Sequence, residues 1–172
     1  TMSANATSPI NGENLHNFAA TGGWTLAKEG RGGDYFNQIA AVPLTPEQEA
    51  LAVRVAEHVF RPCCGNSTFF QDCNHGSALL GLLQLGAAQG LSEEELYDEA
   101  LAFNTYWFPD NYKQTALYFQ EAKNVSWNQV DPQLVLSNLY SSASGWRQNV
   151  SAPLAQLMEG NVQHGGGASC GV

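Results

Sequence analysis

The chain concentrates its thiol and imidazole side chains in one short segment. Three of the four cysteines and two of the four histidines follow the spacing H-x4-C-C-x8-C-x-H. Thiolate and imidazole groups together are typical ligands of zinc, of copper(I) and of iron–sulfur centres. The segment therefore predicts a transition-metal site whose ligands are Cys63, Cys64, Cys73 and His75, with His58 as a fifth candidate.

Two predicted helices would hold this segment at its ends. Thr45-Pro-Glu-Gln48 combines an N-cap, a proline in the first turn and a capping-box glutamine, so a helix should begin there and end before Pro62. A second helix is expected over residues 74–89, which places Cys73 at its N-terminus. The helix dipole favours a thiolate at that position. Asp72 would accept a hydrogen bond from a ligand imidazole and so orient it.

The same cysteines also allow a second interpretation, in which they form disulfides. Cys63 and Cys64 are neighbours, and a bond between neighbours is strained, so one of them would pair with Cys73 and the other with Cys170. Free or redox-active thiols are a third alternative. The chain has neither CxxC nor CxxCH, so a zinc knuckle and covalent haem attachment are not supported. Hydrolase, phosphate-loop and dinucleotide motifs are also missing, which favours a binding protein over an enzyme.

The remaining sequence predicts a mostly α-helical protein, a small helical bundle. Ser92-Glu-Glu-Glu95 is a capping box, and further helices are expected from Asp110, from Asp131 and over residues 153–159. Inward positions are predicted for apolar residues of these helices, including Phe103, Trp107, Leu134 and Leu139. The aromatic residues between 107 and 127 are expected to pack in the core, and the acidic run 93–99 to form a solvated helix terminus. The domain plan is an irregular arm over 1–44, whose glycine-punctuated part either pairs as a short hairpin or wraps the core as loops, then a helical domain over 45–160 and a glycine-rich tail over 161–172.

Length and charge exclude several classes of function. The 172 residues suit one domain, and 7 basic against 16 acidic residues give a formal net charge of -9. A phosphate-backbone binder needs a basic face, so no nucleic-acid partner is expected. A polybasic membrane-surface protein is excluded for the same reason. The longest apolar run, ALLGLLQLGAA, is too short for a transmembrane segment.

Two observations favour a location outside the cytoplasm, whether secreted, periplasmic or at the cell surface. Asn-X-Ser/Thr occurs at Asn5, Asn66, Asn124 and Asn149, which are candidate glycosylation sites. Four cysteines in a chain with only 13% charged residues point the same way. The sequence opens on a polar stretch without a signal peptide, so this prediction implies that a leader or membrane anchor has been removed.

The cysteine segment resembles a known family. Pro62-Cys63-Cys64-Gly65, then Asp72-Cys73-Asn-His75-Gly76, an apolar helix and GLSEEELYDEAL are similar in layout to the PCYCGC-motif proteins, which are cysteine-rich extracytoplasmic bacterial lipoproteins. The order of helix, turn and helix also resembles that of the small thiol-bearing domain of cytochrome c maturation proteins. The resemblance covers about residues 55–107. The chain lacks the second cysteine spacing of the first family and the LRCxxC of the second, so only Cys63, Cys64 and His75 carry over.

These observations lead to two functional hypotheses. The first is an extracytoplasmic protein that binds a transition metal (zinc, copper or iron–sulfur) or a metal cofactor, for metal transfer or electron handling. The resemblance also implies metal or thiol handling outside the cytoplasm. The second is a disulfide-stapled, glycosylated structural or interaction protein of the cell surface, which would have a protein partner or form an oligomer.

Overall fold

The computed structural model describes residues 8–12, 15–17, 28–30, 32–36 and 38–164, and the side chains of these up to residue 159. Helices are the regular elements of this part of the chain, and it contains no strand, which confirms the mostly α prediction. The main helices are α2 (Pro46–His58), α3 (Asn74–Ala88), α4 (Glu93–Trp107), α5 (Pro109–Lys123) and α9 (Ala152–His164). Shorter ones are α6 (Pro132–Leu136), α7 (Asn138–Ser141), α8 (Ala143–Trp146) and the π-helix η4 (Arg147–Ser151), with 3-10 turns η1 (Leu15–Asn17), η2 (Gly32–Tyr35) and η3 (Trp127–Gln129).

The helix starts predicted at Thr45 and at Ser92 are confirmed in atomic detail. The Thr45 hydroxyl accepts a hydrogen bond from the backbone N–H of Gln48, and the Gln48 side chain accepts one from the Thr45 N–H. Ser92 and Glu95 form the same reciprocal pair at α4. Cys73 is the N-cap of α3, and Gly90, with φ of 86°, follows the end of that helix. These caps satisfy backbone donors that a helix N-terminus leaves free.

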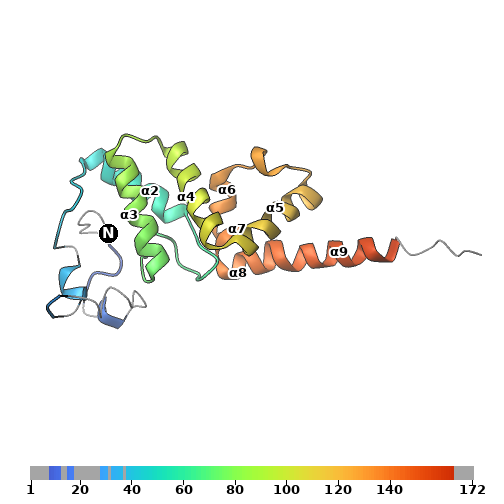
Figure 1. Cartoon of the computed structure of the whole chain (residues 1–172), viewed down its shortest axis with the longest axis horizontal. Coiled ribbons are helices and arrows are strands. Elements are labelled where there is room, and N and C mark those ends of the chain that lie inside the picture. The colour runs from blue at the N-terminus through green and yellow to red at the C-terminus, as the bar shows by residue number, and fades with distance from the viewer. Residues whose placement is uncertain (1–7, 13–14, 18–27, 31, 37, 165–172) are drawn as a thin grey trace, which may run out of the picture.

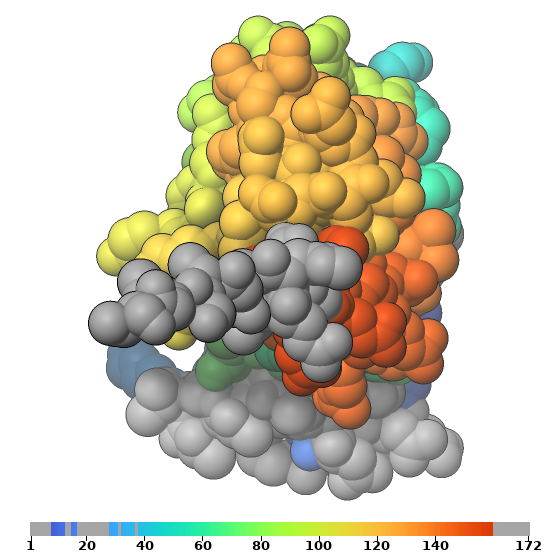
Figure 2. All heavy atoms as spheres, turned by 90° about the vertical axis from the view of Figure 1, so that its right-hand side faces the viewer, coloured from blue at the N-terminus to red at the C-terminus, as the bar shows by residue number. Residues whose placement is uncertain are grey.

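Two apolar clusters hold the helices together. The first joins α2, α3 and α4 around fully buried residues such as Val55, Leu83 and Leu96. The second joins α5 to the short helices and α9 around Tyr112, Phe119 and Val150. Figure 1 shows α2, α3 and α4 at one end of the molecule and α5 with α9 at the other. Figure 2 looks onto the second end, where the side chains of α5 and of the segment after it lie next to those of α9.

Several sequence expectations were wrong in detail. Phe103 is 38% exposed, and the residue after it, Asn104, takes the inward position. Leu134 and Leu139 are exposed, whereas Val135 and Leu136 are buried, because α6 and α7 are single turns separated by an extended Ser137. These short turns do not keep one helical periodicity across both leucines.

The ends of two helices also differ from their predicted positions. Phe108, rather than Asp110, stands at the N-cap of α5, because Pro109 already begins that helix. The last helix does not end at Gly160 but continues to His164. In the predicted hairpin, residues 24–27 lie outside the described part of the chain, and residues 32–35 form the turn η2 rather than a strand.

A buried polar network fixes the start of the cysteine segment. The Asn104 amide donates hydrogen bonds to the carbonyl of Phe60 at 2.9 Å and to the hydroxyl of Tyr112 at 3.1 Å. The Tyr112 hydroxyl is also 2.7 Å from that of Ser141, which donates to the carbonyl of Val135. Since α4, α5 and α7 all contribute, the chain just before the cysteines is anchored to three helices.

We expect this network to make stability depend on pH in the alkaline range. Burial is the main cause that raises the pKa of Tyr112 to about 12. In the unfolded chain the phenol loses its proton near pH 10, so the free energy of unfolding should fall between about pH 10 and pH 12, by roughly 2–3 kcal/mol. Tyr112→Phe should remove this part of the fall in urea titrations at each pH. Tyr106→Phe, on a ring that is 81% exposed, is the control. An unchanged profile for Tyr112→Phe would contradict the assignment.

Candidate metal centre

The loop between α2 and α3 folds back on the end of α2. The backbone N–H of Thr68 donates to the carbonyl of Val59 at 2.8 Å, and that of Phe69 donates to the carbonyl of Ala56 at 3.0 Å. The backbone N–H of Phe60 donates to the carbonyl of Leu136 at 2.8 Å. These bonds return the chain toward its starting point, so residues early and late in the loop come together.

This fold brings three sulfur atoms into one cluster. The Sγ atoms of Cys63, Cys64 and Cys73 all lie within 4.8 Å of one another, and those of Cys63 and Cys64 are 3.9 Å apart. An ion bound by thiolates at about 2.3 Å requires sulfur atoms roughly 3.8–4.0 Å apart, for tetrahedral or trigonal geometry. The cluster therefore has the size that a single ion needs. All three cysteines are free thiols; Cys63 is exposed, and the other two are half-buried.

A fully buried arginine supports the sulfur cluster from beneath. The Nη2 atom of Arg61 is 3.2 Å from the Sγ of Cys64 and 3.9 Å from that of Cys73. Its Nη1 atom donates to the hydroxyl of Thr68 at 2.9 Å. Gly76, in the first turn of α3, leaves room for the guanidinium, because a Cβ there would lie 3.0 Å from Nη2. The sequence showed Arg61 beside the cysteines, but only the fold shows that its charge faces them.

The surroundings shift the pKa of Cys73 and the pKa of Cys63 in opposite directions. Hydrogen bonds from Cys63 and Cys64, then from the backbone N–H of Gly76, together with the charge of Arg61, lower the pKa of Cys73 far below its usual range. Donation to the other two sulfurs and burial raise the pKa of Cys63. Burial opposes the charge on Arg61, but the three neighbouring sulfurs outweigh it and raise the Arg61 pKa. Of the two thiols whose pKa is shifted, Cys73 is thus the one that its surroundings favour as a thiolate.

The structure does not bring the two candidate histidines into this cluster. The His58 Nδ1 atom is 2.9 Å from the carbonyl of Arg54, and its ring lines a separate apolar cavity of about 470 Å³. The His75 ring packs against Trp107 and Phe108, with centroids 5.4 and 4.9 Å apart. His75 is two residues beyond Cys73 along α3, and side chains at that spacing point to different faces of a helix.

Asp72 also has other partners than an imidazole. One carboxylate oxygen accepts a hydrogen bond from the Asn66 amide at 2.8 Å, and the other is 4.0 Å from Nη2 of Arg61. The oxygen that faces Arg61 is buried, and the side chain as a whole is 20% exposed, so the carboxylate lies at the edge of the arginine. The expectation that it orients a ligand histidine was wrong in this arrangement.

The disulfide and glycosylation hypotheses involve Cys170 and the four Asn-X-Ser/Thr sites. Cys170 and Asn5 lie outside the described residues, so the disulfide with Cys170 stays a prediction. The side-chain amide of Asn149 donates to the carbonyls of Leu139 and Gly145, and N-glycosylation at that nitrogen would break at least one of these bonds. The Asn66 amide is bonded to Asp72, whereas Asn124 is exposed at the left-handed C-cap of α5.

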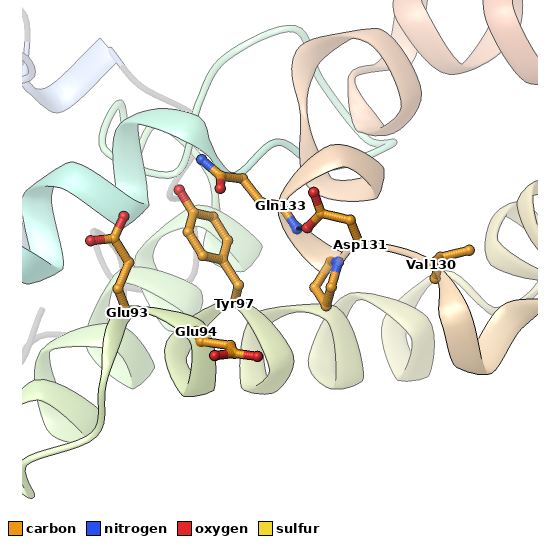
Figure 3. A pocket seen from close by; sticks show the side chains of 7 residues that line it. Glu93, Glu94, Tyr97, Val130, Asp131 and Gln133 are labelled. Atoms are coloured by element: carbon orange, nitrogen blue, oxygen red, sulfur yellow. Dashed lines mark hydrogen bonds between the residues drawn. The ribbon is translucent and has the colours of Figure 1, made fainter.

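A second concave site lies between the N-termini of α4 and α6. It is a pocket of about 550 Å³ whose lining includes Glu93, Glu94, Tyr97 and Asp131 (Figure 3). Glu93 pairs with Arg54 at 2.9 Å, and Asp131 caps α6 through the N–H of Gln133. Among the described residues, the three cysteines are the group whose ligand atoms converge for a metal ion, and these carboxylates do not. The acidic residues here act at helix ends, as the sequence predicted.

Comparisons of the chain with protein-family models, with curated proteins and with solved structures gave no match. In the described part of the chain no helix combines the length and the apolar character that crossing a membrane requires.

We expect the hydrogen bond from Arg61 to the Thr68 hydroxyl to stabilise the fold, because it satisfies part of a buried charge. It accepts from Nη1 of Arg61 and donates to the carbonyl of Val59 at 2.9 Å. Thr68→Val should leave a buried charged donor unpaired and lower the free energy of unfolding by about 1–3 kcal/mol in urea denaturation. Thr115→Val is a matched control, since that buried hydroxyl bonds only the carbonyl of Asn111 in its own helix among the contacts described. Equal losses in the two variants would contradict this role.

Proposed function

We propose that this protein binds one thiophilic transition-metal ion through the Sγ atoms of Cys63, Cys64 and Cys73. The convergence of the three sulfurs within 4.8 Å is the observation that carries the proposal. Thiolates select soft or borderline ions, such as copper(I) and zinc, over magnesium or calcium. An iron–sulfur cluster is less well supported, because such clusters are held by four cysteines, whereas three converge among the described residues.

The accessibility of the site favours transfer of the ion over a purely structural role. Structural zinc sites have four protein ligands, whereas sites with three keep a position for an external ligand. Within the described residues no fourth cysteine, histidine or carboxylate joins the three sulfurs. Cys63 is exposed at the mouth of the cluster. An external ligand, from water or from a partner protein, can therefore complete the coordination and exchange.

Metal titration of the reduced protein tests this proposal. With a phosphine reductant, zinc(II) or copper(I) should bind at one ion per chain and raise the midpoint of thermal unfolding, since binding to the folded state stabilises it. Each of Cys63→Ser, Cys64→Ser and Cys73→Ser should lower the affinity by more than about 100-fold, because loss of a ligand exceeds the usual cost of losing an outer-shell partner. Cys170→Ser is the control that removes a thiol from outside the proposed ligand set.

Two results would contradict the metal proposal. One is binding of one ion per chain with unchanged affinity in any of the three Cys→Ser variants. The other is a denatured mass, for protein from its native source, about four hydrogens below that of the reduced chain, which would mean two disulfides and favour the stapled structural protein.

We also propose that the protein acts outside the cytoplasm. Support comes from the four cysteines, the Asn-X-Ser/Thr sites and the low content of charged residues. Fractionation of the source cells, with a cytoplasmic marker as control, should recover the chain in the extracytoplasmic fraction. Recovery with the marker would overturn the location without affecting the metal proposal.

A further inference from the structure

Arg61 is the one basic side chain in contact with the sulfur cluster among the described residues, and it has no exposed surface. Its Nη2 atom is closer to the Sγ of Cys64, at 3.2 Å, than to the nearest carboxylate oxygen, on Asp72, at 4.0 Å. Its Nε atom has no hydrogen-bond partner in the described structure. The counter-charges available to this buried cation are therefore the Asp72 carboxylate and whatever negative charge the nearer sulfurs carry.

We infer that Arg61 selects the class of ion, favouring mono- and divalent thiophilic ions, whose complexes with three thiolates are anionic. This inference rests on the proposed metal site. Three thiolates leave two negative charges around a monovalent ion, one around a divalent ion and none around a trivalent ion such as arsenic(III). A fixed cation in contact with two of the three ligands stabilises these complexes in that order.

The fold holds the guanidinium where this effect is strong. The Thr68 hydroxyl fixes one end of it, and Gly76 allows the other end to lie against the first turn of α3. Because the group is excluded from water, its interaction with the complex is screened less than that of a surface charge. The exposed Arg54, which pairs with Glu93 on the outside of α2, has no such position.

Comparison between ions separates this electrostatic effect from damage to the fold. Every ion starts from the same metal-free protein, so the state of the free thiols cancels when affinities for two ions are compared. A variant that merely displaces the sulfurs should lower the affinity for all three ions alike. Loss of the charge should instead lower each affinity in proportion to the negative charge of the complex.

The experiment measures affinities of the full chain for silver(I), cadmium(II) and arsenite by competition titration under a phosphine reductant. Arg61→Met should weaken arsenite binding least, and the loss should grow by about tenfold or more for each negative charge of the complex. Arg61→Lys keeps the charge, so its relative affinities for the three ions should be close to those of the unmodified protein. Arg54→Met removes the same charge from the surface and should leave all three affinities unchanged.

A further variant moves the charge without removing it. In Gly76→Ala the added methyl group lies against Nη2 and displaces the end of the arginine, so the same order of losses should appear at smaller size. Equal losses for the three ions in Arg61→Met, or no losses, would overturn the inference and leave the metal site standing. Failure of the unmodified protein to bind any of the three ions would overturn the proposed function, and the inference with it.

Discussion

The contact between the Arg61 guanidinium and the sulfur atoms is the interaction on which the arrangement of the α2–α3 loop depends. A buried charge destabilises a fold unless its neighbours compensate it, and here the neighbours are two cysteines, the Thr68 hydroxyl and the Asp72 carboxylate. The loop therefore cannot relax around the arginine without also moving the thiols. Its backbone hydrogen bonds to α2 and to Leu136 complete the enclosure. The geometry of the cluster is therefore coupled to the position of one cation.

Helices farther along the chain also hold the α2–α3 loop in place. Asn104, fully buried in α4, holds the carbonyl of Phe60, the residue just before Arg61. The carbonyl of Cys64 accepts from the backbone N–H of Ala143, at the start of α8. The entry to the cysteine segment is thus tied to α4, and Cys64 is tied to α8, whose Trp146 packs against the second apolar cluster. The site therefore depends on contacts with helices on both sides and not on the α2–α3 loop alone.

Features that depend on local chemistry could be predicted from the sequence, and features that depend on distant contacts could not. The caps at Thr45, Cys73 and Ser92 require only residues within one turn, so their types and spacing sufficed. The three cysteines were correctly grouped because a short loop between two helix ends limits their separation. The direction of His75, however, depends on aromatic rings more than thirty positions away. His58 bonds the Arg54 carbonyl one turn earlier in its own helix, a local contact that the ligand spacing did not reveal. The burial of Arg61 likewise has no local signal.

Cys73 takes part in the fold and in the sulfur cluster through the same atom. Its Sγ caps α3 by accepting from the backbone N–H of Gly76 at 3.4 Å, a task for which the oxygen of serine is the better acceptor. A serine there would be expected to begin the same helix, at no cost in stability from the cap itself. The start of α3 therefore does not require a sulfur atom, so exchanging one atom of the side chain separates the cap from the cluster.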